Sequence, residues 1–310
     1  IGFMEGGPAW IAWKQYGLSV LAVETTTAEG DTHYNASAWV LKGSDIADAH
    51  LDGDDSTDPF ALLEGKTSCH TGWLKSAGML MPMGYLIKNG YVTSIGDASD
   101  INSLRTTIDS HFDGSEGNGN AASIPDSGSL YSGYSGAIEC LSTGYGDVAF
   151  AKGDDFSTPE KYCGDENASN NEEWCLDMDE YVQLPSFGQS PSHPVMYNPE
   201  LLDVHTRNAI LNAMLSWSDE MWIEDYPMGD QTYTGCYNVV THQVADIPMN
   251  QCGGEIISSV TSKGFKLVAG NSQNHLASYS SLLGSIPGLS EYYHSSDKYG
   301  ITDAEDSEQN

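Results

Sequence analysis

A segment in the first third of the chain combines a hydroxyl, a cation and a run of small residues. Thr71 supplies the hydroxyl, Lys75 follows about one helical turn later, and Ser76, Ala77 and Gly78 come next. Small side chains leave backbone N–H groups approachable, and the N-terminus of a helix favours negative charge. These residues are the parts of an anion-binding site at a helix start. On spacing alone, a capped helix that carries an ordinary surface lysine is the simpler interpretation.

The same segment resembles the carbonate-binding motif of the transferrin family. That motif is written S-C-H-T-G-x-x-R-S-A-G-W followed by P-x-G, and this chain has S-C-H-T-G-W-L-K-S-A-G-M followed by P-M-G. The resemblance implies that Thr71, Lys75, Ala77 and Gly78 bind carbonate. Lys75 stands where the family usually has arginine, so a flexible point charge replaces a planar fork that binds carbonate through two hydrogen bonds.

Four further matches occur in the family's order and at similar spacing. G-Y-S-G-A-I-E-C-L, with G-D-V-A-F after it, resembles the motif of a tyrosine ligand and points to Tyr134. P-S-H resembles a histidine-ligand motif and points to His193. The stretch from Tyr34 resembles the strand of the other tyrosine ligand, and M-E-G-G resembles L-D-A-G with Glu5 in place of aspartate. The resemblance implies that Glu5, Tyr34, Tyr134 and His193 bind ferric iron.

The chemistry of this set suits Fe(III), a hard cation that prefers anionic oxygen ligands to thiolates. Two phenolates, a carboxylate, a neutral imidazole and a bidentate carbonate would complete a roughly octahedral site. Taken singly, each residue has a simpler interpretation: a tyrosine in a strand packs, a histidine in a loop is solvated, and Glu5 between Met4 and two glycines is a turn residue.

The cysteines and two glycosylation patterns favour the secretory pathway. Asn35 and Asn167 each begin an Asn-Ala-Ser sequence. Six cysteines allow fifteen pairings. The resemblance implies that one disulfide joins the anion-site helix to a strand after Tyr134, and the remaining pairs are then expected to be local. The expected pairs are Cys69 with Cys140, Cys163 with Cys175, and Cys236 with Cys252.

The charge of the chain excludes nucleic acid as a partner. Forty-four acidic residues against twelve basic ones give a net charge of −32, which repels phosphate backbones. Cationic partners are favoured, although the acidity is also typical of a solvated surface suited to salty water. No apolar run reaches the roughly 18 residues that a membrane-spanning helix needs.

Strands and helices alternate along the chain, which predicts an α/β fold. Apolar runs at residues 18–23, 36–41, 84–87 and 147–151 are typical of strands, and helical spacing occurs around Trp10 and, after Pro199, over residues 201–215. Loops are expected at 109–131 and 153–173. The chain begins abruptly in strand-like sequence, so we expect a fragment whose first strands are missing.

The resemblance implies a lobe of two α/β subdomains around a cleft. We expect a partial first subdomain at residues 1–39, a second subdomain with the anion site at 40–190, a return to the first at 191–294, and an acidic tail at 295–310.

The sequence therefore predicts an extracellular or cell-surface protein, not an enzyme, that binds ferric iron with carbonate for transport or uptake. Its acidity and variant ligands are similar to those of the phytotransferrins, the cell-surface iron-uptake proteins of algae. A cell-surface receptor and further lobes of the parent chain are possible partners. The alternative is an extracellular structural or adhesive protein that has lost the metal. A serine hydrolase is disfavoured, because G-Y-S-G-A around Ser135 is not G-x-S-x-G.

Overall fold

The computed structural model describes residues 1–27, 30–54, 56–112, 131–153, 158–164, 172–261 and 266–294. The chain divides into two compact units, each made from two separate stretches. Unit 1 comprises Ile1–His33 and Pro191–Ala277, and unit 2 comprises Tyr34–Ser190 and Ser278–Asn310. Asn167 and the tail 295–310 lie outside the described residues.

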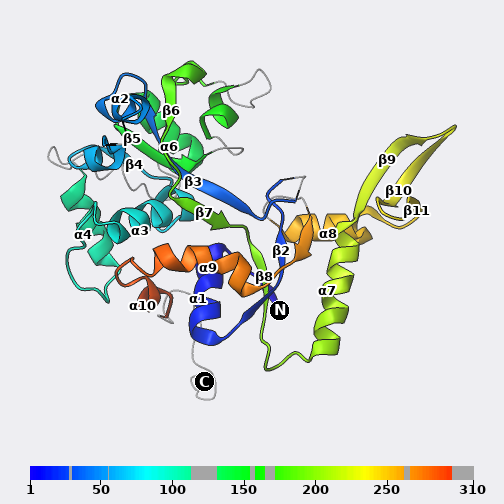
Figure 1. The fold of residues 1–310 in the computed structure, drawn as a ribbon. Coiled ribbons are helices and arrows are strands. Elements are labelled where there is room, and N and C mark those ends of the chain that lie inside the picture. The colour runs from blue at the N-terminus through cyan, green and yellow to red at the C-terminus, as the bar shows by residue number, and fades with distance from the viewer. Residues whose placement is uncertain are drawn as a thin grey trace, which may run out of the picture. The chain divides into compact units, whose positions relative to one another are not determined.

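Unit 1 is built on an antiparallel sheet with the strand order β1-β8-β2-β12. Its strands are β1 (Gly2–Phe3), β2 (Ser19–Glu24), β8 (Pro194–Tyr197) and β12 (Leu267–Ala269). Apolar side chains leave the sheet on both faces. Helix α1 (Gly6–Tyr16) and the first part of α9 (Ser272–Leu283) pack on one face, and α7 (Val204–Ser218) and α8 (Gly253–Val260) pack on the other (Figure 1).

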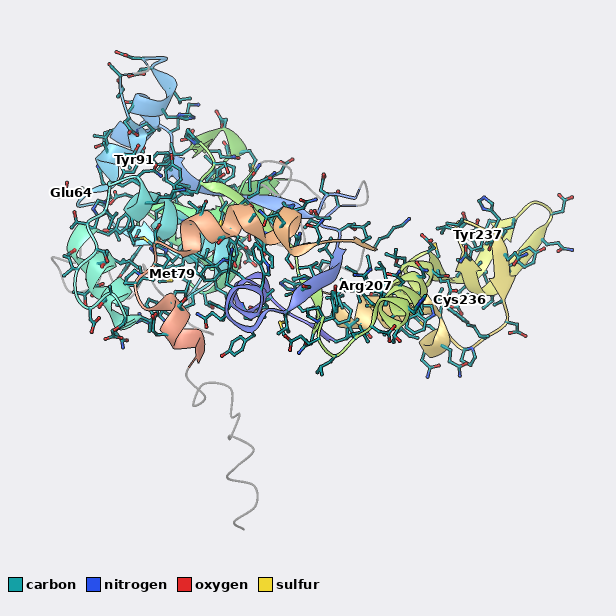
Figure 2. The ribbon with its side chains drawn as sticks, turned by 60° about the horizontal axis from the view of Figure 1, so that its bottom comes forward. Glu64, Met79, Tyr91, Arg207, Cys236 and Tyr237 are labelled. Atoms are coloured by element: carbon teal, nitrogen blue, oxygen red, sulfur yellow. A yellow bond between two sulfur atoms is a disulfide. The ribbon has the colours of Figure 1, made fainter. Side chains whose placement is uncertain are left out.

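A second, smaller antiparallel sheet in unit 1 follows helix α7. It contains β9 (Glu220–Met228), β10 (Gln231–Asn238) and β11 (Gln243–Ala245), in the order β11-β10-β9. The disulfide between Cys236 and Cys252 ties β10 to the start of α8. Figure 2 shows Cys236 and Tyr237 on this sheet.

Unit 2 is built on a mixed sheet with the order β4-β5-β3-β6, and β7 also pairs with β3. Its strands are β3 (His33–Leu41), β4 (Ser68–Cys69), β5 (Val148–Lys152), β6 (Tyr181–Gln183) and β7 (Gly188–Pro191). Its helices are α2 (Asp45–Leu51), α3 (Met81–Lys88), α4 (Asn102–His111), α6 (Gly133–Ser142) and α10 (Leu289–His294). Ile138 and Leu141 of α6 pack against Trp39, Ala149 and Ala151 of the sheet.

Most of the expected elements form, with shifted ends. The runs at 18–23, 36–41 and 147–151 lie in or overlap β2, β3 and β5. The run at 84–87 is not a strand but part of α3, whose first turn contains Pro82. Helix α7 begins at Val204, later than Pro199 indicates, because the Asp203 side chain accepts hydrogen bonds from the N–H groups of His205 and Thr206.

The unit boundaries differ from the expected subdomain limits at two places. The first falls before Tyr34 rather than after residue 39, so the whole ligand strand from Tyr34 onward belongs to unit 2. Residues 278–294 also belong to unit 2 rather than to the first subdomain, because Tyr279 and Leu282 contact Ser76 and Gly84 of that unit. Across the described residues, every helix is too short or too polar to span a lipid bilayer.

Candidate metal and anion site

The predicted anion site is a tight turn between β4 and helix α3. A π-helical turn, Ser76–Leu80, leads directly into α3. The N–H of Leu80 donates to the Lys75 carbonyl at 2.9 Å. The amides of the four residues before Leu80 therefore precede the first hydrogen bond of the helix. Lys75 occupies the N-cap position in an extended conformation, and its side chain is exposed.

Thr71 and Gly78 meet face to face at this turn. Thr71 is 5 % exposed, and its Oγ1 is buried without a hydrogen-bond partner among the described residues. A Cβ at position 78 would collide with Thr71 Oγ1, so only glycine fits there. A buried hydroxyl without a partner costs about 1–3 kcal/mol. An oxyanion at the helix start would satisfy both the hydroxyl and the amides, so the residues present fit carbonate.

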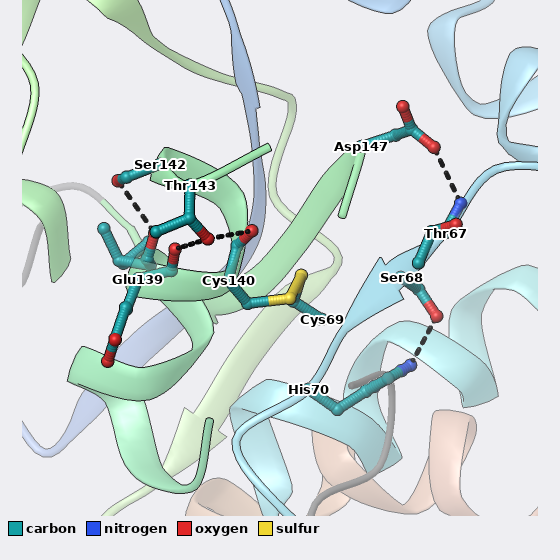
Figure 3. The surroundings of a disulfide bond; sticks show 10 residues. Thr67, Ser68, Cys69, His70, Glu139, Cys140, Ser142, Thr143 and Asp147 are labelled. Carbon is teal, nitrogen blue, oxygen red and sulfur yellow. Dashed lines mark hydrogen bonds between the residues drawn. A yellow bond between two sulfur atoms is a disulfide. The ribbon is translucent and has the colours of Figure 1, made fainter. Parts of the chain in front are cut away.

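His70 stabilises the turn through two side-chain hydrogen bonds. Its Nδ1 donates to the Gly78 carbonyl at 2.8 Å, and its Nε2 accepts from the Ser68 hydroxyl at 3.0 Å (Figure 3). His70 is fully buried, and this burial lowers its pKa to about 4. The imidazole is therefore neutral near pH 7, which is consistent with one donating and one accepting ring nitrogen.

The two predicted tyrosine ligands lie together in unit 2. Tyr34 is near the start of β3, and Tyr134 is the second residue of α6, not a residue before a strand as the sequence predicted. Burial, followed by the charge of Tyr34 and side-chain hydrogen bonding with Tyr34, raises the pKa of Tyr134 well above its usual value.

Lys152 is a member of this group that sequence reasoning missed. It ends β5, it is 7 % exposed, and its Nζ lies 4.0 Å from the ring centroid of Tyr34 and 5.2 Å from that of Tyr134. A lysine at the end of a buried apolar strand was the available signal. A cation over two phenol rings interacts favourably with them and would stabilise their ionised forms.

One disulfide and one backbone hydrogen bond connect α6, the helix of Tyr134, to the anion turn. Cys69 and Cys140 form the expected pair, but the elements differ from the expectation: Cys69 lies in strand β4 rather than in the anion-site helix, and Cys140 lies in helix α6 rather than in a strand (Figure 3). The N–H of Gly133 donates to the Thr71 carbonyl at 2.8 Å. The start of α6 is thus held against the turn that carries the unpaired hydroxyl. Cys163 pairs with Cys175 in the same unit.

Glu5 and His193 lie in unit 1, at the ends of two strands that pair with each other. Strand β1 pairs with β8 through Phe3 and Val195, and the Met4 N–H donates to the Pro194 carbonyl at 3.1 Å. Glu5 is exposed and precedes α1 without capping it by its side chain.

Glu24, at the end of β2, lies beside His193 and was also missed in the sequence analysis. Its side chain is 2 % exposed, its Oε1 lies 4.0 Å from His193 Nδ1, and its N–H donates to the His193 carbonyl at 3.1 Å. The Ser192 hydroxyl donates to the Glu24 carbonyl at 2.6 Å. A carboxylate beside one ring nitrogen orients the imidazole and leaves the other nitrogen for a ligand. Asn35, the described glycosylation candidate, is half-buried in β3.

Comparisons with known proteins cover both the motifs and the strands that carry them. The profile of the family described as Transferrin matches residues 3–197, more than half of the chain. Human melanotransferrin is 30 % identical over 169 residues, which cover 48 % of this chain and 21 % of that protein. Ovotransferrin of Gallus gallus is 33 % identical over 165 residues, with the same two coverages. Serotransferrin of Paralichthys olivaceus is 26 % identical over 268 residues, covering 80 % of this chain and 35 % of its own length.

The solved structure of transferrin 1 from Manduca sexta aligns with a TM-score of 0.42 at 20 % identity, over 61 % of this chain and 32 % of that one. The chain spans only about a fifth to a third of the length of the relatives named above. Since the family profile covers every motif from the turn at Glu5 to His193, the chain belongs to the transferrin family.

Proposed function

We propose that this chain binds ferric iron together with carbonate and serves its extracellular transport or uptake. The observation that carries the proposal is the buried, unpartnered Thr71 hydroxyl facing Gly78 at a helix start. A structural protein without a ligand would gain stability by pairing or removing that hydroxyl. Its retention supports a bound anion.

Carbonate would bind to the Thr71 hydroxyl and to the amides of Ala77 and Gly78, with the Lys75 ammonium beside it. Tyr34 and Tyr134 would supply two phenolate oxygens, and Glu5 and His193 a carboxylate oxygen and an imidazole nitrogen. These are the donors that a hard trivalent cation prefers. The closeness of the two phenols, which contributes to the raised pKa of Tyr134, supports their action on one ion.

The formal charges of this set nearly cancel. Two phenolates, one carboxylate and carbonate carry five negative charges, against three positive charges on the ferric ion and one on Lys75. The ammonium of Lys152 over the phenol rings would balance the last one. Near-neutrality is what burial of an ion requires.

The paired cysteines and the family membership support an extracellular setting for this function. The net charge of −32 suits attraction of cations and not of nucleic acid. Uptake at a cell surface through a receptor, the role expected from the acidity and the variant ligands, is the role we propose within this setting.

The test is a difference absorption spectrum on adding ferric iron with bicarbonate, because a phenolate bound to Fe(III) produces a visible charge-transfer band. We expect a band in the wild-type chain and its loss in Tyr34→Phe and Tyr134→Phe. Tyr237→Phe is the matched control, since its hydroxyl bonds His242 on the smaller sheet of unit 1. Absence of a band in the folded wild type would instead favour the structural or adhesive alternative.

A further inference from the structure

A residue outside all the recognised motifs contacts the start of the anion turn. Tyr279 lies in α9, its side chain is 0 % exposed, and its hydroxyl is 2.6 Å from Ser76 Oγ. Ser76 is the first residue of the π-helical turn and carries one of the amides that precede the first helical hydrogen bond. Both residues belong to unit 2.

Close packing fixes the position of Tyr279 relative to this turn. One turn of α9 further along, Leu282 lies directly on Gly84 of α3, where a Cβ would come within 2.6 Å of the Leu282 carbonyl oxygen. The backbones of α9 and α3 therefore touch at a site that excludes any side chain. Because α9 is packed tightly against α3, the Tyr279 side chain has little freedom to rotate, and its hydroxyl is held at a fixed position.

We infer that Tyr279 is a positioning residue for the anion: its hydrogen bond to Ser76 holds the helix start in the geometry that carbonate requires. This inference rests on the proposed function. When the bond is lost, Ser76 and its amide become free to shift, and a small displacement of a donor weakens a site that depends on several convergent donors. The metal ligands keep their own chemistry, so the defect lies in anion affinity.

The experiment compares wild type, Tyr279→Phe, Ser76→Ala and the double variant, with Tyr237→Phe as the control that loses a phenol hydroxyl elsewhere. The bicarbonate concentration that gives half of the charge-transfer band is measured at fixed ferric iron. Calorimetric titration of bicarbonate into the iron-free chain gives a second readout that does not depend on iron. Urea unfolding of each variant monitors the fold.

We expect each single variant to need about 2- to 12-fold more bicarbonate, the factor that corresponds to one hydrogen bond. The double variant should match either single one, because both remove the same bond. Excess bicarbonate should restore the full band, which a collapsed site would not allow. Unchanged bicarbonate dependence in Tyr279→Phe, additive effects in the double variant, or failure of excess bicarbonate to restore the band would overturn the inference.

The two hypotheses fail in different ways. A wild-type chain that forms no band but binds bicarbonate, with weaker binding in Tyr279→Phe, would refute iron binding and keep the positioning role. A wild-type chain that forms the band, with a variant indistinguishable from it, would refute only the positioning role. Binding of neither ion would refute both.

Discussion

At the scale of single residues, the Thr71 hydroxyl is the polar group of the anion site whose burial is not compensated by a hydrogen bond among the described residues. Thr71 Oγ1 is buried and unpartnered among the described residues, whereas the hydroxyl of Thr107, which is also buried, donates to the Ser103 carbonyl at 2.7 Å. Two buried threonines in one unit therefore have opposite hydrogen-bonding status. That contrast supplies a matched pair for testing whether the unpaired one serves a ligand.

Thr71→Val should stabilise the iron-free chain and weaken its anion site. Valine keeps the shape and removes the unsatisfied hydroxyl, which should add about 1–3 kcal/mol to the free energy of unfolding. Thr107→Val breaks a satisfied bond and should lower it. Urea unfolding checks both signs, and bicarbonate titration should show weaker binding only in Thr71→Val. A destabilised Thr71→Val protein would mean that the hydroxyl already has a partner.

On the proposed function, Lys75 should influence the pH at which acid releases the metal. Protons convert carbonate to bicarbonate and compete with the metal for its ligands, so acid disfavours bound Fe(III). Lys75→Arg supplies a bidentate fork and should move release to lower pH, whereas Lys75→Ala should move it to higher pH, on the order of one unit, and increase the dependence on bicarbonate.

The charge-transfer band, followed against pH at fixed bicarbonate, gives the midpoint for each of these proteins. Lys88→Ala, an exposed lysine at the other end of α3, should leave the midpoint in place. Superimposable curves for the Lys75 variants would remove Lys75 from the site.

Residues recognised from the sequence differ in kind from those it missed. Thr71 and Gly78 lie in one short motif, so their types and spacing are visible in the sequence. Glu24, Lys152 and Tyr279 act through neighbours that are far away in the chain, such as Glu24 with His193 and Tyr279 with Ser76. Strand pairing and helix packing create those contacts, and no local pattern encodes them.

At the scale of elements, the start of α6 and the anion turn form one connected group. The Gly133 N–H bonds the Thr71 carbonyl, and the disulfide joins Cys69 to Cys140. The Cys69–Cys140 disulfide joins residues 71 apart in the sequence, whereas the Cys163–Cys175 disulfide joins residues 12 apart. The longer loop loses more conformational entropy on closure in the unfolded chain.

Replacing Cys69 and Cys140 together by alanine should lower the free energy of unfolding by about 4 kcal/mol, against about 3 kcal/mol for Cys163 and Cys175. Only the first change should also weaken bicarbonate binding, because only that disulfide holds the anion turn against α6. Urea unfolding and the bicarbonate dependence of the band test the two parts. Equal bicarbonate affinity in both double variants would separate the disulfide from the site.

The type of an element, helix or strand, could be predicted from a longer apolar run but not from a short one. Residues 36–41 form a six-residue run that is apolar except for Ser37 and lies in β3, whereas 84–87 is four residues long and forms part of α3. Such a run fits a strand or a buried helix equally well. Pro82, favourable in a first helical turn and unfavourable within a sheet, was the available evidence for the helix.

At the scale of the whole molecule, each unit contains a buried histidine whose charged form is disfavoured. Burial lowers the pKa of His70 in unit 2 and of His275 in unit 1 from 6.5 to about 4. The His275 Nε2 donates to the Ser192 carbonyl at 2.9 Å, and His70 holds Gly78. Both histidines therefore support residues next to the proposed ligands.

These pKa values predict that the chain loses stability in acid. As pH falls below 6.5, these histidines become protonated in the unfolded chain but stay neutral in the folded chain until about pH 4. The free energy of unfolding therefore falls across this range. The loss is about 3 kcal/mol for each histidine. His70→Asn and His275→Gln each retain the donating group and should each reduce the fall.

Urea unfolding at pH 7, 5 and 4 measures the slope for each of these variants. His205→Asn, an exposed histidine at the start of α7, should keep the wild-type slope. An unchanged slope in His70→Asn would mean that His70 titrates alike in both states.

The unpaired hydroxyl of Thr71 also bears on how long the protein survives. A ligand that binds only the folded chain raises its resistance to cleavage in proportion to its occupancy, because proteases act on opened forms. On the proposed function, a chain that has released its iron and carbonate is then cleaved more readily than the loaded chain. The hydroxyl that would receive the anion would thus also link the loss of cargo to faster turnover.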